Sequence, residues 1–308
     1  MARTLRVACV QLSPCFKDPA RSRGRASALI APLDPDTLDL LVLPEMAFTG
    51  YCFESQEDIA PFVEDVETGE TKQWAAQTAH KLNCYVLVGL PTAAPASPSP
   101  STAPTYYNSL LVVSPSGALA GVYHKHHLYG TLTNDGADYL WATAGEAFVA
   151  LDLPFPSSST SSSSPLDSFR LVPGICMDLN ERDFAPTSEH ALATFARDER
   201  ADVLVVAMSW LDGEALAEEE EERVDEDSDK WDDVRDVISY WVARCMPLLG
   251  SGAALVAANR VEREGDTVFT GSSCAVELGA RPAVAQWANK RGEAVIVAEL
   301  ALPERDEN

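Results

Sequence analysis

The chain has 308 residues, a length that allows one large domain or two of ordinary size. Hydrophobic residues make up 46% of it, which is normal for a globular protein, and the formal net charge is -24. A surface this acidic repels nucleic acid and anionic membranes, so we expect neither as a partner.

The seven cysteines are odd in number and form no CxxC pair, which argues against a zinc site or a redox dithiol. Most of them lie in apolar runs, as small buried side chains do in a reducing compartment. The first residues lack the apolar run of ~7 residues and the cleavage site of a secretory signal, and no run approaches the ~18 residues of a membrane span. We therefore expect a cytoplasmic protein.

Short strands rich in Val, Leu, Ile and Ala run through the whole chain. In chain order we expect them at residues 5–12, 39–44, 84–89, 108–113, 118–124, 170–175, 203–207, 254–258 and 294–298. Several are continuously apolar, as strands covered on both faces are. The Ser-Pro-Ser-Gly turn at residues 114–117 pairs two of these strands as a hairpin, so the sheet is expected to be mixed.

Apolar residues at helical spacing predict two helices between these strands. One contains Trp74 and Leu82, and the other runs from Val234 to Cys245, with Pro247 as its stop signal. The alternation of strands and helices indicates an α/β layered fold.

Three stretches interrupt the pattern. Residues 93–105 are rich in Pro, Ser and Ala, residues 156–165 are nearly all Ser, and residues 214–230 are crowded with acidic side chains. The strand pattern resumes unchanged after each, so we interpret them as surface insertions in a single domain spanning residues 1–308. The acidic stretch could border a cleft and attract a cationic substrate, although a solvated loop is the commoner case.

Cys176 is the first residue that could carry chemistry, because it lies where a strand ends and a polar stretch begins. A cysteine at such a junction can point into a cleft, where backbone N–H groups stabilise a thiolate or an oxyanion. Taken alone, a buried structural thiol is the more frequent role of a cysteine.

Glu45 and Lys125 also follow predicted strands. Burial at the end of a strand would raise the pKa of Glu45 toward the range of a general base, with a plain surface glutamate as the alternative. Lys125 could stabilise an oxyanion and help to hold Cys176 as a thiolate. The neighbouring His126 and His127 would point to opposite faces of a strand, and no carboxylate or cysteine lies near them in sequence, so we expect no metal site.

In their order and context, these segments resemble the nitrilase, or carbon–nitrogen hydrolase, superfamily. The similar segments are residues 7–12, 43–45, 123–128, 174–178, 257–261 and 269–273. The resemblance implies a four-layer αββα sandwich with mixed sheets and a reaction that needs neither metal nor organic cofactor. It also implies that Glu45 is the general base, Lys125 the oxyanion support and Cys176 the nucleophile that forms a thioester.

One feature departs from this family's pattern. Many members have a second active-site glutamate after the lysine motif, whereas the next glutamate here is Glu146. Asp135 is our first candidate for the missing carboxylate and Asp138 the second. Because aspartate is one methylene shorter, either the loop compensates or this role is reduced or lost.

Residues 174–180, and Asn180 above all, are similar to fungal protein N-terminal asparagine and glutamine amidohydrolases. This narrower resemblance implies hydrolysis of the side-chain amide of N-terminal Asn or Gln to Asp or Glu plus ammonia, as a step of the N-degron pathway. The partners would be protein or peptide N-termini that begin with Asn or Gln, and we favour a monomer.

A substrate of this kind has a positive α-amino group, so its site needs hydrogen-bond acceptors. Asp178 could be one, although we prefer a helix N-cap for it. Trp210 could form a pocket wall, with core packing as the commoner alternative. Two other functions stay open: a small-molecule amidase, ω-amidase, carbamoylase or nitrilase of the same superfamily, and a catalytically inactive binding protein.

Overall fold

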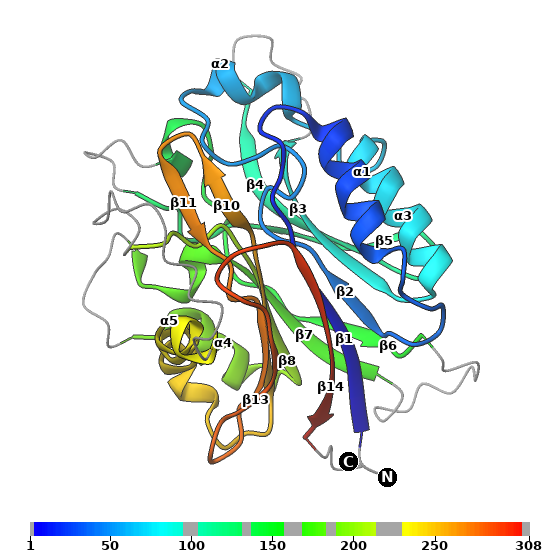
Figure 1. Ribbon diagram of the computed structural model, residues 1–308, viewed down its shortest axis with the longest axis vertical. Helices are drawn as coiled ribbons and strands as arrows, with labels where there is room; N and C mark the ends of the chain where they lie inside the picture. Colours follow the sequence, from blue (N-terminus) through cyan, green and yellow to red (C-terminus); the bar gives the residue numbers. More distant parts are fainter. Residues whose placement is uncertain are drawn as a thin grey trace.

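Two six-stranded sheets pack face to face at the centre of the computed structural model, and helices cover their outer faces (Figure 1). The structure describes residues 3–94, 104–130, 137–156, 168–182, 189–213 and 230–303. This arrangement confirms the predicted four-layer αββα sandwich with mixed sheets. Within the described residues, no helix is both long and apolar enough to cross a membrane.

The first sheet has the strand order β14-β1-β2-β3-β4-β5. Its strands are β14 (Ala294–Leu302), β1 (Arg3–Gln11), β2 (Leu40–Val42), β3 (Tyr85–Ala93), β4 (Tyr106–Val113) and β5 (Leu119–His124). The strands β1, β2 and β3 are parallel, and the other pairs are antiparallel. The pairing of β1 with β14 places the two ends of the chain side by side (Figure 1).

The second sheet has the order β13-β12-β9-β8-β7-β6, with β7, β8 and β9 parallel. Its strands are β13 (Ala283–Trp287), β12 (Cys274–Glu277), β9 (Ala254–Asn259), β8 (Val203–Met208), β7 (Ser168–Ile175) and β6 (Leu151–Pro154). A separate hairpin of β10 (Val261–Glu264) and β11 (Thr267–Thr270) follows β9.

Strand β1 shows why the predicted strands are continuously apolar. Val7 and Cys9 belong to the core between the two sheets, whereas Ala8 and Val10 belong to the core beneath the helices. Successive side chains of a strand point to opposite faces, so a central strand of this sandwich must be apolar on both.

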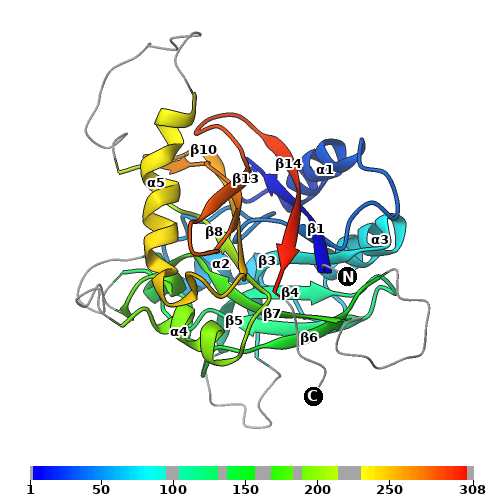
Figure 2. The ribbon, with the colours of Figure 1, turned by 90° about the horizontal axis from the view of Figure 1, so that it is seen from below.

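The helices α1 (Pro19–Ile30) and α3 (Glu70–Leu82) cover the first sheet, and α4 (Ala191–Asp198) and α5 (Lys230–Arg244) cover the second (Figures 1 and 2). The shorter helices are α2 (Gln56–Ile59) and the 3-10 helices η1 (Ala60–Phe62), η2 (Ala137–Leu140), η4 (Cys176–Leu179) and η6 (Met246–Leu248). In α5, the predicted apolar face is confirmed, because Val234, Ile238 and Trp241 are buried. This helix ends at Arg244, shortly before Pro247.

Every strand predicted from an apolar run is present. The sequence patterns missed α1, α4, β6 and β10 to β13, which are short or carry exposed polar residues. Of the three predicted insertions, Ala93 belongs to β3 and Lys230 begins α5, while residues 95–103, 157–167 and 214–229 lie outside the described residues. The single-domain organisation stays a prediction.

Candidate active site

The candidate residues lie just beyond the carboxyl ends of parallel strands, where open α/β sheets place their sites. Glu45 follows β2, Cys176 follows β7 and Ser209 follows β8. Lys125 comes directly after β5, and its backbone N–H donates to the carbonyl of Asn108 on β4 (2.8 Å). The sandwich thereby brings together residues that are far apart in sequence.

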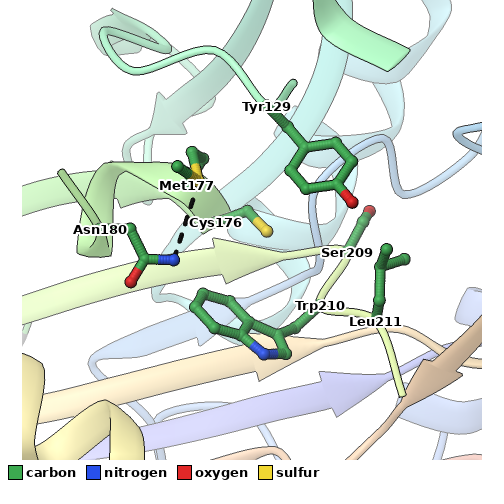
Figure 3. A pocket seen from close by; sticks show the side chains of 7 residues that line it. All are labelled: Tyr129, Cys176, Met177, Asn180, Ser209, Trp210 and Leu211. Carbon is green, nitrogen blue, oxygen red and sulfur yellow. Dashed lines mark hydrogen bonds between the residues drawn. The ribbon is translucent and has the colours of Figure 1, made fainter. Parts of the chain in front are cut away.

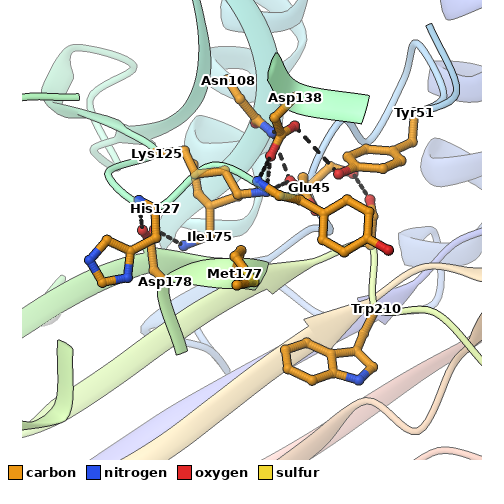
Figure 4. A network of polar contacts seen from close by, with 12 residues as sticks. Glu45, Tyr51, Asn108, Lys125, His127, Asp138, Ile175, Met177, Asp178 and Trp210 are labelled. Atoms are coloured by element: carbon orange, nitrogen blue, oxygen red, sulfur yellow. Dashed lines mark hydrogen bonds and ion pairs between the residues drawn. The ribbon is translucent and has the colours of Figure 1, made fainter. Parts of the chain in front are cut away.

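Lys125 lies between two carboxylates at the base of this site (Figure 4). Its Nζ is 2.7 Å from Glu45 Oε1 and 2.6 Å from Asp138 Oδ2, and all three side chains are fully buried. Burial alone would lower the pKa of Lys125, but the charges of Asp138 and Glu45 raise it above its usual value. Lys125 is therefore a fixed cation in a site that excludes water.

The two oxygens of the Glu45 carboxylate have different surroundings. Oε1 accepts hydrogen bonds from Lys125 Nζ and Asn108 Nδ2, both 2.7 Å long. Oε2 is buried and has no hydrogen-bond partner among the described residues. Burial raises the pKa of Glu45, although the charge of Lys125 opposes the rise. A buried carboxylate with one unpaired oxygen and a raised pKa is suited to accept a proton.

Gly89 on β3 makes room for the Glu45 segment. The backbone of Gly89 donates to Pro44 (3.2 Å) and accepts from Ala47 (2.9 Å), so the two segments are bonded on either side of Glu45. A Cβ added at Gly89 would lie 2.6 Å from the Cα of Glu45, closer than real contacts allow. The position of Glu45 therefore depends on the absence of a side chain at position 89 of β3.

Cys176 is the first residue of η4 and has a left-handed backbone with φ of 44°. Such a backbone conformation is strained for any residue other than glycine, and the surrounding structure holds it in place. Burial raises the pKa of the Cys176 thiol well above its usual value, the charge of Glu45 adds to the rise, and Lys125 opposes it. Lys125 thus favours the thiolate and burial disfavours it, and the role of Lys125 in holding Cys176 as a thiolate stays a prediction.

A pocket of about 180 Å³ opens over Cys176. Figure 3 shows the sulfur pointing into it. Its lining consists of Tyr129, Cys176, Met177, Asn180, Ser209, Trp210 and Leu211, none of which carries a formal charge at neutral pH when the thiol is protonated. The charges of the site thus lie beneath the pocket, and the walls formed by the described residues are neutral.

Asp138, the second candidate for the missing glutamate, reaches Lys125. It also accepts hydrogen bonds from the backbone of Tyr129 (2.8 Å), from Asn108 Nδ2 (3.3 Å) and from the hydroxyl of Tyr51 (3.4 Å). The first candidate, Asp135, lies outside the described residues. Helix η2 thus holds the shorter Asp138 side chain within 2.6 Å of Lys125, and the part played by Asp135 stays a prediction.

Asp178 does not face the pocket, which corrects its assignment as a substrate ligand. Its Oδ1 accepts from the backbone of His126 (3.1 Å) and His127 (2.7 Å), and its Oδ2 accepts from Tyr123 Oη and the Ile175 backbone, both 2.8 Å. With four donors and 1% exposure it has no free oxygen for an α-amino group. It ties the Lys125 segment to η4, and it does so from within η4 and not as its N-cap.

Asn180 and Trp210, the other two candidate binding residues, both line the pocket. The Asn180 side chain bonds to Met177 and Tyr240. Trp210 packs against Tyr240 and Trp241, with ring centroids 5.7 and 5.9 Å apart. Whether either contacts substrate stays a prediction.

The histidines around Lys125 support the main chain. Because β5 ends at His124, the rings of His126 and His127 do not alternate as on a strand; their centroids are 5.1 Å apart, and both pack on Phe148. His126 Nδ1 bonds to the carbonyl of Gly145 and His127 Nδ1 to that of Asn180.

The sequence patterns missed Asn108, Tyr129 and Ser209. Asn108 is fully buried in β4 and bonds both Glu45 and Asp138. A polar residue inside an otherwise apolar strand was the available signal for it, because such a residue needs a buried partner.

Comparison with known proteins places this site in a family. The model of the carbon-nitrogen hydrolase family matches residues 6–179. The chain is 31% identical over 281 residues to the Protein N-terminal amidase of Schizosaccharomyces pombe (strain 972 / ATCC 24843), covering 86% of this chain and 87% of that relative. Two solved structures, titled N-terminal amidase with Asn-Glu peptide and with Gln-Val peptide, share its fold; each has a TM-score of 0.81, 19% identity and 99% coverage of both chains. By sequence and by fold, the chain belongs to the carbon–nitrogen hydrolase family, as its resemblance predicted.

Proposed function

We propose that this chain hydrolyses the side-chain amide of an N-terminal Asn or Gln in a protein or peptide, giving Asp or Glu plus ammonia. The proposed substrate rests on one observation, the 31% identity to the S. pombe Protein N-terminal amidase over 87% of its length. The chemistry agrees with the site, where a thiol at the base of a pocket adjoins a buried carboxylate and a buried lysine.

The reaction begins with the Cys176 thiol protonated, because burial raises its pKa. The unpaired Oε2 of Glu45 takes the proton as the sulfur attacks the carbon of the substrate carboxamide. The carboxamide oxygen becomes an oxyanion, which the Lys125 ammonium and the backbone N–H groups at the start of η4 stabilise.

Collapse of this tetrahedral intermediate breaks the carbon–nitrogen bond. The protonated Glu45 returns its proton to the leaving nitrogen, ammonia departs, and a thioester to Cys176 remains. Water then enters, Glu45 removes its proton, and the hydroxide attacks the thioester carbon. In the second collapse the carbon–sulfur bond breaks and Glu45 returns its proton to the sulfur, which restores the thiol. The product leaves as a carboxylic acid, which loses its proton to solvent.

Asp138 supports this chemistry through Lys125. It holds the ammonium as a second carboxylate partner, at 2.6 Å, and its charge raises the pKa of Lys125. Without Asp138, Lys125 would have Glu45 as its one carboxylate partner, and its ammonium group would be less fixed in position. Asp138 therefore takes the place of the second family glutamate as a positioning residue.

A small-molecule amidase of the same family is the second candidate function. The described pocket walls carry no carboxylate that could pair with an α-ammonium, an observation that favours a substrate without one. The catalytically inactive alternative is not favoured, since Glu45, Lys125 and Cys176 are assembled around one pocket.

The test measures ammonia released from short peptides that begin with Asn or Gln, beside N-acetylated copies of the same peptides. Release from the free N-termini alone, absent in Cys176→Ala, is the expected result. Cys15→Ala is the matched control, because Cys15 is also a free thiol but lies outside the pocket lining. Release from small amides but from no peptide would replace this proposal with the second candidate.

The proposal extends to the surroundings of the enzyme. We infer a monomer in the cytoplasm that supplies new N-terminal Asp and Glu residues to the N-degron pathway. Size-exclusion chromatography with light scattering and fractionation of cells test the two parts separately.

A further inference from the structure

Asn180 lies in the pocket wall, and its side-chain amide is held in one direction. Its Oδ1 accepts a hydrogen bond of 2.6 Å from the hydroxyl of Tyr240, and its Nδ2 is 3.7 Å from Met177 Sδ. Figure 3 shows the nitrogen turned toward Met177 and the oxygen turned away from it.

The chemistry of the two neighbours fixes which end of the amide is which. A thioether sulfur can only accept a hydrogen bond, so the end of Asn180 that faces Met177 must be the NH2 group. The carbonyl end then faces Tyr240, whose hydroxyl donates to it. The end of Asn180 beside Met177, which also lines the pocket, is therefore a hydrogen-bond donor. Met177 accepts from one N–H of this NH2 group, so among the described residues its second N–H is available to a ligand.

The main chain around Asn180 is also fixed. The Asn180 carbonyl accepts from His127 Nδ1 (2.8 Å), and the Leu179 carbonyl accepts from Arg244 Nε (2.8 Å). Arg244 belongs to α5 and forms a buried ion pair of 2.7 Å with Glu181. Because its backbone is fixed in this way, Asn180 loses little conformational entropy when it binds a ligand.

The exposed fractions of the residues around the pocket indicate which part of a substrate lies next to Asn180. Glu45 is fully buried and Cys176 is 6% exposed, whereas Asn180 is partly buried and Tyr240 is 41% exposed. The reacting carboxamide must lie at the buried end, beside the sulfur, so the backbone of the same residue lies nearer the opening. Near the opening, an N-terminal residue has two polar backbone groups, its α-ammonium and its carbonyl oxygen. The α-ammonium can only donate hydrogen bonds, so the carbonyl oxygen is the group that can accept one from Asn180.

We propose that Asn180, oriented by Tyr240, donates a hydrogen bond to the backbone carbonyl oxygen of the substrate's first residue. This inference rests on the proposed function, because it requires a substrate that carries such a carbonyl. Asn180 is then a specificity-determining residue, and the α-amino group is bound elsewhere. Tyr240 is a positioning residue that acts through Asn180.

The experiment compares a substrate that carries the backbone carbonyl which Asn180 is proposed to contact with one that lacks it. One is an Asn-Gly peptide amide, and the other is 3-aminopropanamide, which is asparagine with its α-carboxyl group replaced by hydrogen. Asn180→Ala is expected to lower kcat/KM for the peptide about tenfold, the effect of one lost hydrogen bond, and to change that for 3-aminopropanamide less than about twofold. If the small amide is not turned over, its inhibition constant against the peptide is measured instead.

Two further variants separate binding from structure. Asn180→Asp keeps the size and the acceptor for Tyr240 but replaces the donor with a carboxylate oxygen, so the selective loss is expected to be at least as large. Tyr240→Phe leaves the amide free to turn, and a selective loss of about threefold is expected. Equal losses on both substrates in the two Asn180 variants would overturn the inference. If the wild-type protein deamidates no peptide at all, it is the proposed function that fails.

Discussion

The charged floor of the pocket (Glu45, Lys125, Asp138 and Cys176) and its neutral wall (Asn180, Trp210 and Leu211) are built in opposite ways. In the floor, Lys125 Nζ lies 2.7 Å from Glu45 and 2.6 Å from Asp138, whereas the wall consists of uncharged, partly buried side chains. Burying charge is costly, and at this pocket the described charges lie in the floor, where protons must move. We therefore expect changes in the floor to lower kcat and changes in the wall to raise KM.

The substitution Asp138→Asn tests the floor and is expected to have a larger effect than Gly89→Ala or Trp210→Phe. Lys125 would lose one of its two carboxylate partners, and the new amide can turn an NH2 group toward the ammonium. We expect kcat on an Asn peptide to fall at least about 100-fold, with KM changed little, in steady-state kinetics.

Asp135→Asn is the matched control, because the sequence alone ranks Asp135 above Asp138. Activity within about twofold of wild type is expected for it. A larger loss from Asp135→Asn than from Asp138→Asn would show that the floor has been assigned to the wrong aspartate.

This pair of residues marks the limit of what the sequence could predict for the site. Glu45, Lys125 and Cys176 each follow a recognisable strand, so their approach to one another follows from the fold. Asp135 and Asp138 follow no recognisable strand pattern, so the sequence ranks them only by their spacing from Lys125. A pattern read along the chain does not show that η2 holds Asp138 against Lys125.

Distance along the chain limits the prediction of the wall in the same way. Tyr240 is 60 residues beyond Asn180, and α5 brings the two together. The apolar face of α5 was predictable because Val234, Ile238 and Trp241 recur at helical spacing. The partner of a half-exposed tyrosine on the same helix was not, since nothing in its spacing points to Asn180.

The short elements were missed for a related reason. Helix α1 buries only Ser22, Ala26 and Ile30, so its apolar periodicity is weak. Strand β13 is largely exposed and mixes Gln286 with small residues, and it pairs with β12 at the edge of its sheet. Tertiary contacts determine such elements, and intrinsic pattern contributes little.

Gly89→Ala tests how closely the floor depends on its support. The added Cβ would lie 2.6 Å from the Cα of Glu45, so the carboxylate must shift. Because displacements of about 1 Å can reduce turnover by roughly two orders of magnitude, we expect kcat to fall about 30-fold.

Gly24→Ala is the control for adding a methyl group to this chain. A Cβ at Gly24 meets no atom within 4 Å, and alanine favours the α1 helix, so unchanged activity and a slightly higher Tm are expected. Wild-type kcat in Gly89→Ala would show that the Glu45 segment can move without effect on catalysis.

The pH dependence of alkylation tests the protonation state of Cys176, the thiol of the floor. Burial raises the pKa of the Cys176 thiol, so at neutral pH the thiolate is a minor form that increases about tenfold per pH unit. We expect the iodoacetamide rate at Cys176, followed by mass spectrometry, to rise by that factor for each unit between pH 7 and 9. A free cysteine, with a pKa of about 8.5, should level off within this range. A rate at Cys176 that is constant from pH 6 to 8 would indicate a resting thiolate and contradict this view of the floor.

Trp210→Phe tests the wall and is expected to have the smallest effect. The indole lines the pocket and packs on Tyr240 and Trp241, contacts that a phenyl ring keeps in part. Losing roughly 30 Å² of apolar contact at about 25 cal/mol per Å² corresponds to a KM about threefold higher, with kcat unchanged. Steady-state kinetics on the peptide used for Asp138→Asn allows a direct comparison. A fall in kcat as large as that of Asp138→Asn would mean that the wall takes part in the chemistry, and the division between a charged floor that reacts and a neutral wall that binds would no longer hold.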